Sequence, residues 1–245
     1  MPIPAPISMK RLLLAGCLIL AALPRPAGAD GVNLSWVNCA GASDGVADLT
    51  FNCDSETQMF TMVGSFVPPG GISQLSAEDI FVDFITDKPA LPDWWRMDAM
   101  GCRPSTLLCP IPLLPLTGCN DYWGGDAAGG FNYISNAGSG RGQIEIVAAR
   151  PSTELAGVTA GQEYYAFELV VKSQGTLACS GCRDGVCAVI RSITLCQPTG
   201  MGDYVLTNSN IRNYVTWQGG SANCQAAGAH ALKRTTWGRV KGNYR

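Results

Sequence analysis

The sequence has little of what most enzymes use for acid–base chemistry at neutral pH. Its 245 residues include one histidine, His230, and only 15% of them are charged. A Ser-His-Asp triad would need that histidine as its base, and no Gly-x-Ser-x-Gly elbow accompanies it. We therefore expect a binding or structural protein and not an enzyme.

Helical periodicity and long apolar runs are also missing from the body of the chain, residues 30–232. No stretch of about a dozen residues keeps a 3.6-residue period, which argues against βαβ units. No run in the mature part is long enough to cross a bilayer, so we expect no transmembrane segment there.

The N-terminus, residues 1–29, has the features of a signal peptide. Lys10 and Arg11 precede an apolar run that ends at the small residues Ala27-Gly28-Ala29. This pattern predicts a secreted, extracellular protein, with the periplasm or the outer surface as alternatives. Leu14-Ala15-Gly16-Cys17 is similar to a lipobox, and the alternative is a lipoprotein anchored through Cys17.

Ten cysteines follow the leader, and this even number predicts five disulfides in an oxidising compartment. They are Cys39, Cys53, Cys102, Cys109, Cys119, Cys179, Cys182, Cys187, Cys196 and Cys224. Proximity favours Cys39–Cys53 across a first hairpin and Cys102–Cys119 around a proline-rich loop, while the full connectivity stays open. The Cys-x-x-Cys spacing leaves a redox pair or a zinc site as alternatives to structural disulfides.

Short stretches with a period of two dominate the rest of the chain. They predict about ten strands, at 32–37, 46–51, 59–66, 80–86, 129–135, 143–148, 163–172, 186–195, 204–207 and 214–217. With 29 glycines and 15 prolines punctuating them, they indicate an all-β fold. We expect a single disulfide-rich antiparallel β-sandwich over 30–232, jelly-roll or immunoglobulin-like, and a short helix in the C-terminal tail 233–245.

Charge is distributed unevenly between these two parts. All 19 acidic residues lie in 30–232 with nine basic ones, whereas 233–245 carries five basic residues and no acid. An acidic body repels phosphates, so we expect no nucleic-acid partner. The basic tail is suited to folding onto the acidic body or to reaching an anionic surface.

Aromatic residues provide the candidate ligand site. Trp94 and Trp95 are adjacent, and adjacent strand residues face opposite sides, which predicts one exposed ring. Tyr122 and Trp123 precede a Gly-Gly pair in a predicted loop. Exposed rings on a β-sandwich stack on sugars, so these four residues predict carbohydrate binding. The alternative is that the tryptophans plug the ends of the sandwich.

Acidic residues supply two further alternatives. Asp83, Asp87, Asp93 and Asp98 could furnish the paired carboxylates of a glycan hydrolase. Asp121 and Asp126 flank the Tyr-Trp-Gly-Gly loop and leave calcium as an alternative, although no EF-hand spacing is present. We otherwise expect no cofactor and no metal.

The last ten residues, Thr236-Trp237-Gly238-Arg239-Val240-Lys241-Gly242-Asn243-Tyr244-Arg245, carry a resemblance. They resemble the ending of a group of uncharacterised secreted bacterial proteins with a TWGxVKxxYR-like motif. Four inner stretches resemble the same group: 91–95, 101–103, 179–182 and 216–220. The resemblance implies a secreted bacterial protein and transfers no activity.

These observations together predict a secreted binding or structural module. Its expected partner is a polysaccharide or a surface protein. The alternatives are the glycan hydrolase and a self-assembling cell-surface structural protein.

Overall fold

A computed structural model describes residues 29–111, 118–220 and 224 of the chain. The predicted signal peptide apart from Ala29, Cys17 of the lipobox-like stretch, His230 and the predicted C-terminal helix lie outside these residues. No helix in the described ranges is long and apolar enough to span a membrane.

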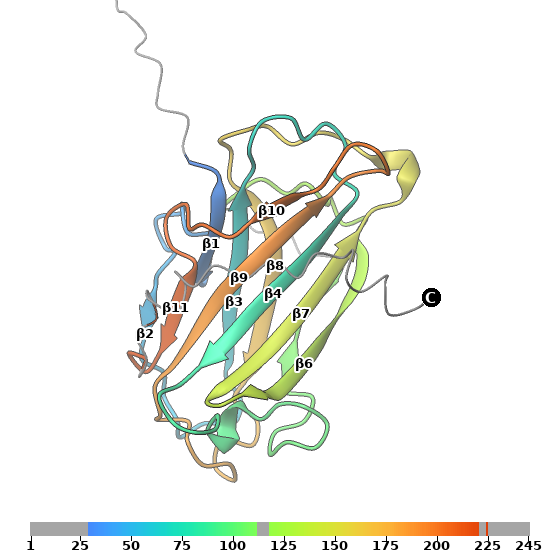
Figure 1. The fold of residues 1–245 in the computed structure, drawn as a ribbon. Helices are drawn as coiled ribbons and strands as arrows, with labels where there is room; N and C mark the ends of the chain where they lie inside the picture. Colours follow the sequence, from blue (N-terminus) through green and yellow to red (C-terminus); the bar gives the residue numbers. More distant parts are fainter. Residues whose placement is uncertain (1–28, 112–117, 221–223, 225–245) are drawn as a thin grey trace, which may run out of the picture.

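The described chain folds into two β-sheets that face each other (Figure 1). The four-stranded sheet has the order β1 (Gly31–Trp36), β3 (Met59–Val67), β8 (Tyr164–Lys172), β5 (Leu107–Leu108). The main path of the seven-stranded sheet is β2 (Asp48–Leu49), β11 (Tyr214–Trp217), β9 (Val186–Cys196), β4 (Ala77–Ile85), β7 (Arg141–Ala149), β6 (Ala128–Gly138). The remaining strand, β10 (Tyr204–Leu206), also pairs with β9.

Each of the ten predicted ranges overlaps a strand of the structure, although in 46–51 that strand is only Asp48–Leu49. β1 is buried along its whole length, whereas other strands alternate between a buried face and an outer one. In β7, for example, Ile144 and Ile146 are buried whereas Glu145 and Val147 are exposed. The named strands pair in antiparallel fashion except for the short parallel contact between β11 and β2, and isolated parallel bridges join Val32 to Ser209 and Asn120 to Tyr164. The sandwich-like, all-β architecture therefore agrees with the sequence, and the choice between jelly-roll and immunoglobulin-like stays a prediction.

One short strand, β5, was not predicted from the sequence. The sequence predicts a surface loop over 102–119 that cannot join the centre of a sheet, and within it Leu107–Leu108 pairs with β8 at the edge of the four-stranded sheet. A two-residue strand is too short to show a period of two, so the sequence gives no signal for it.

The core between the sheets contains an aromatic cluster centred on Trp217. Its indole stacks on Trp94 with 4.5 Å between centroids and on Phe51 with 4.2 Å. The Trp217 Nε1 proton is donated to the Cys182 carbonyl at 2.6 Å, so the ring is fixed in the core by a polar contact as well.

Four disulfides brace this fold, and they differ from the expected local pairs. The bonds are Cys39–Cys119, Cys53–Cys182, Cys102–Cys179 and Cys187–Cys224. The predicted pairs Cys39–Cys53 and Cys102–Cys119 are wrong, because proximity in sequence does not bring these residues together in a fold built from long-range strand pairs.

Two of the ten cysteines are unpaired thiols, which corrects the prediction of five disulfides. Cys109 and Cys196 are both partly buried and have no disulfide partner among the described residues. Burial raises the pKa of Cys109 to about 12 and that of Cys196 to about 11, so both are thiols at neutral pH.

Candidate functional site

The adjacent tryptophans lie on a single 3-10 turn and not on a strand. This turn, η1 (Asp93–Trp95), begins after Pro92, whose carbonyl accepts the Trp95 N–H at 2.8 Å. Successive side chains on a 3-10 helix are separated by about 120°, so two neighbours can both point inward. Trp94 and Trp95 are accordingly both fully buried.

Trp94 is held on several sides by polar groups. Its Nε1 proton is donated to Thr176 Oγ1 at 2.9 Å, and the Arg103 guanidinium lies 3.7 Å from the ring centroid. Arg103 is itself buried and donates to the Trp94 carbonyl at 2.7 Å and the Gln174 carbonyl at 2.8 Å. Burial lowers the pKa of Arg103 to about 10, which leaves a buried cation over an aromatic face.

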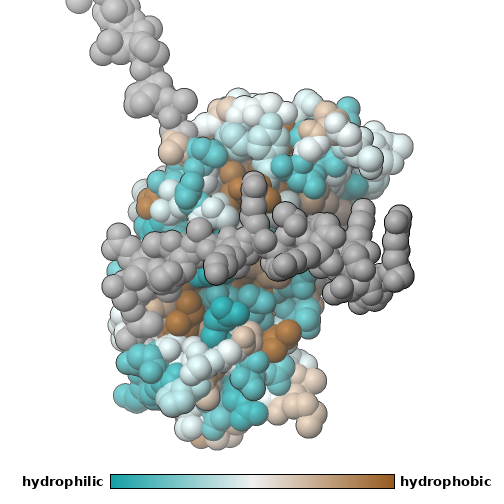
Figure 2. All heavy atoms as spheres, in the orientation of Figure 1, coloured by the Kyte–Doolittle hydropathy of each residue, from teal (hydrophilic) through white to brown (hydrophobic). Residues whose placement is uncertain are grey.

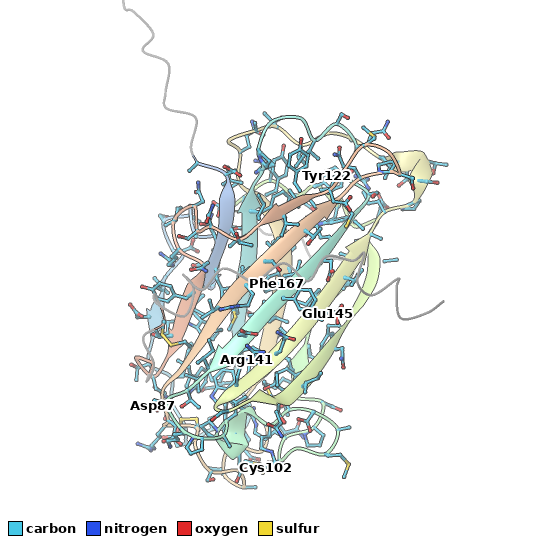
Figure 3. All side chains as sticks on the ribbon, in the orientation of Figure 1. Asp87, Cys102, Tyr122, Arg141, Glu145 and Phe167 are labelled. Atoms are coloured by element: carbon cyan, nitrogen blue, oxygen red, sulfur yellow. A yellow bond between two sulfur atoms is a disulfide. The ribbon has the colours of Figure 1, made fainter. Side chains whose placement is uncertain are left out.

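Tyr122 and Trp123 are buried at the opposite end of the sandwich from Cys102, as Figure 3 shows for Tyr122. The Tyr122 hydroxyl donates to the Leu75 carbonyl. The Asp121 carboxylate accepts the Trp123 N–H at 2.8 Å and the Gly124 N–H at 3.1 Å, which closes the turn.

The predicted aromatic platform is therefore wrong. Trp94, Trp95 and Trp123 have no exposed surface and Tyr122 has 8%, so none offers a ring face to a sugar. The alternative holds, because these rings fill the sandwich. The sequence argument failed because it assumed strand geometry for Trp94-Trp95, where a 3-10 turn occurs.

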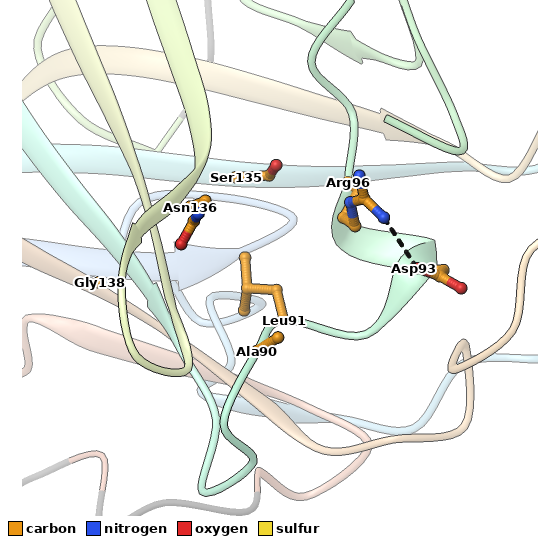
Figure 4. Close-up of a pocket in the computed structure, with 7 residues that line it drawn as sticks. All are labelled: Ala90, Leu91, Asp93, Arg96, Ser135, Asn136 and Gly138. Carbon is orange, nitrogen blue, oxygen red and sulfur yellow. Dashed lines mark hydrogen bonds and ion pairs between the residues drawn. The ribbon is translucent and has the colours of Figure 1, made fainter. Parts of the chain in front are cut away.

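The region around η1 nevertheless contains a pocket of about 240 Å³ (Figure 4). Its lining comes from the approach to η1, from η1 and its C-cap, and from the end of β6. The residues are Ala90, Leu91, Asp93, Arg96, Ser135, Asn136 and Gly138. The two residues that flank the buried tryptophans thus line the pocket, while the tryptophans themselves do not.

A break in strand register creates the β6 side of this pocket. The pairing of β6 with β7 is regular as far as Ile134 and resumes only at Gly138. Residues 135–137 are therefore released from the ladder, which places Ser135 and Asn136 at the pocket. Such irregularities often lie next to functional sites because they redirect side chains.

The pocket carries an ion pair, and a further carboxylate lies near it. Arg96 Nη1 lies 3.3 Å from Asp93 Oδ1, and both side chains are about half exposed. Nearby, Asp98 Oδ2 accepts the Ser135 N–H at 3.3 Å. The hydrogen bonds from Ser135, supported by one from Met100, lower the pKa of Asp98, so that this carboxyl is ionised at neutral pH.

The other acidic residues named from the sequence have structural contacts. Asp83 lies 3.6 Å from Arg141 and 3.4 Å from Arg191 on the seven-stranded sheet. Asp126 lies 3.5 Å from Arg150, so it and the turn-closing Asp121 are both engaged by protein groups. Within the described residues, no three His, Cys, Asp or Glu side chains converge as metal ligands would.

Comparison with known proteins shows a structural likeness and no family. No protein-family model matches the chain, and no curated protein matches its sequence. Among solved structures, a cohesin module from the Clostridium perfringens ATCC13124 family 33 glycoside hydrolase is similar with a TM-score of 0.35. The two chains are 6% identical, and the match covers 77% of this chain and 94% of that one. A likeness at this level carries no conclusion about function.

Proposed function

We propose that the protein is an extracellular binding module whose ligand site is the pocket beside η1. The observation that supports this is the convergence of Asp93, Arg96, Ser135 and Asn136 at one hollow. A guanidinium, a carboxylate, an amide and a hydroxyl together present both donors and acceptors. This set suits a polyhydroxylated ligand, and carbohydrate is the class we propose.

Hydrogen bonds and a disulfide hold the segments that line the pocket in place. The Trp95 carbonyl accepts the Tyr133 hydroxyl proton at 2.5 Å, which ties η1 to β6. The Trp94 N–H is donated to the Ser180 carbonyl at 2.9 Å, and the Cys102–Cys179 disulfide joins the neighbouring segments. A site held by buried aromatic residues and a disulfide loses little conformational entropy on binding.

The size of the pocket limits what it can hold. Pockets for drug-sized ligands have volumes of about 300 to 1,000 Å³. At about 240 Å³, this one suits a single sugar unit at a chain end or a branch. We therefore expect recognition of a terminal residue and not of the middle of a flat polysaccharide surface.

The test is binding of the purified protein to a glycan array, followed by titration of the hits and assay of reducing ends in the same samples. We expect the variants Arg96→Met and Asn136→Ala to weaken binding at least about tenfold, because each removes a polar group from the pocket. Arg183→Met is the matched control, since Arg183 is exposed and is not part of the pocket lining.

Two results would contradict the proposal. Binding that is unchanged in both pocket variants would place the ligand elsewhere on the molecule. Release of reducing ends that disappears in an Asp93→Asn or Asp98→Asn variant would establish a hydrolase instead of a binding module.

A further inference from the structure

The outer face of the seven-stranded sheet carries acidic and apolar side chains together. We define this face by the side chains that alternate away from the core on β10, β9, β4, β7 and β6. One row across it runs Val205, Thr194, Asp79 and Val147, and the next row includes Phe81 and Glu145. Val205 is 59% exposed and Val147 41%. Figure 2 views the molecule from this side, and the coloured surface that it shows is hydrophilic and hydrophobic side by side.

Two carboxylates on this face have no basic partner among the described residues. Asp79 and Glu145 occupy adjacent rows, and neither forms an ion pair there, whereas Asp83 one row further on is matched by Arg141 and Arg191. Burial and the negative charge of Glu145 both raise the pKa of Asp79. A cation placed near these two carboxylates would relieve their repulsion.

The chain itself returns to this face at Cys224. The Cys187–Cys224 disulfide fixes residue 224 to β9. The two cysteines form a small hydrophobic cluster with Val189, separate from the main core, and Ile85 and Tyr214 pack against it. By their register, the strand residues of this cluster belong to the outer face.

The 21 residues that follow Cys224 have the complementary chemistry. The segment 225–245 contains no acidic residue and carries Lys233, Arg234, Arg239, Lys241 and Arg245. Trp237, Val240 and Tyr244 supply apolar groups among these charges. We propose that segment 225–245 docks across the outer face of its own chain, with its basic residues near Asp79 and Glu145 and its apolar residues on Val147 and Val205.

The distances along the chain allow this docking. Cys187 and Thr194 lie on the same strand, seven residues apart, which corresponds to about 23 Å at 3.3 Å per residue. The 13 residues from Cys224 to Trp237 reach that far even when they are only partly extended. Because the disulfide holds the start of the segment on the face, docking in the same molecule is favoured over docking between molecules by effective concentration.

The test is limited digestion of the whole protein with trypsin, which cleaves after the lysines and arginines of the tail, with the released peptides quantified by mass spectrometry. We expect the tail to be cleaved at least about tenfold more slowly than a synthetic peptide of residues 225–245. The double variant Asp79→Asn/Glu145→Gln should accelerate tail cleavage about fivefold, as should raising the salt concentration.

Two further variants separate docking from altered folding. Val147→Ser should also accelerate cleavage, because it removes an apolar contact without changing charge. Asp126→Asn/Glu154→Gln is the matched control, since both acids are exposed and neither is on the outer face. The control should cleave like the unaltered protein, and equal melting temperatures would show that all variants are folded.

Three results would overturn the proposal. The first is tail cleavage as fast as that of the free peptide, or cleavage in the double variant that is no faster than in the unaltered protein. The second is protection that grows with protein concentration, which would place the tail on a second copy. The third is protection that appears only when anionic lipid vesicles are added, which would make a membrane surface the partner.

Discussion

Glu78 allows a test of how a buried carboxyl group affects the stability of this fold. The residue lies on β4 between Leu195 and Ala148, faces the core and has no exposed surface. Neither carboxylate oxygen makes a hydrogen bond within the described residues. Burial therefore raises the pKa of Glu78 well above its ordinary value of 4.5.

The sign of the pH effect follows from this shift. Above pH 4.5 the unfolded chain releases the Glu78 proton, while the folded protein still holds it. The folded state then loses stability as the pH rises, by about 1.4 kcal/mol for each pH unit until the folded carboxyl also ionises. At pH 7, 2.5 units above 4.5, the loss has an upper limit of about 3.4 kcal/mol.

The measurement is urea unfolding of the protein and of Glu78→Gln at several pH values between 4 and 8. The Gln variant keeps the shape and removes the titration, so its stability relative to the unaltered protein should rise with pH. Glu78→Met removes the buried polar group as well and should stabilise the fold at pH 7 by about 1 to 3 kcal/mol. Exposed Glu154→Gln is the control. Parallel stability profiles for Glu78→Gln and the unaltered protein would refute the reasoning.

Three other predictions concern the packing and the cysteines. Trp217→Ala should cost about 3 to 5 kcal/mol in chemical unfolding, because Trp217 is fully buried at the centre of the aromatic cluster; a loss below about 1 kcal/mol would contradict that role. Replacing Cys53 and Cys182 by alanine should cost about 5 kcal/mol, since their bond spans 129 residues; an unchanged urea midpoint would contradict this. Native Cys109 and Cys196 should react with iodoacetamide at pH 8 at least about tenfold more slowly than in urea, because their pKa values are raised; equal rates, followed by mass spectrometry, would show that they are exposed.

The strands of this protein could be predicted from the sequence because alternation is a local property. A period of two in segments such as 143–148 records which side chains meet the core, and no knowledge of the partner strand is needed. Disulfide connectivity is a property of the whole fold. Cys102 bonds to Cys179, 77 residues away, and the two cysteines lie in the segments before β5 and after β8, two strands that pair with each other in the four-stranded sheet.

The candidate site, too, could be predicted from the sequence only in part. The sequence pointed to Trp94-Trp95 because adjacent tryptophans are unusual, and the pocket does lie beside them. Its lining, however, comes from Arg96 on one segment and Asn136 on another, and the second is placed by a break in the β6 ladder. A register break depends on the neighbouring strand, so it leaves no pattern in the segment itself.

The order of the cysteines has a consequence for how the protein matures. Each of the four native disulfides skips at least one intervening cysteine, so none joins two that are consecutive in the chain. If the chain is exported as its N-terminus predicts, pairing of consecutive cysteines as they emerge would produce only non-native bonds. Native pairing from that state would need thiol–disulfide exchange. We expect the protein to depend on a disulfide isomerase as well as an oxidase for its yield.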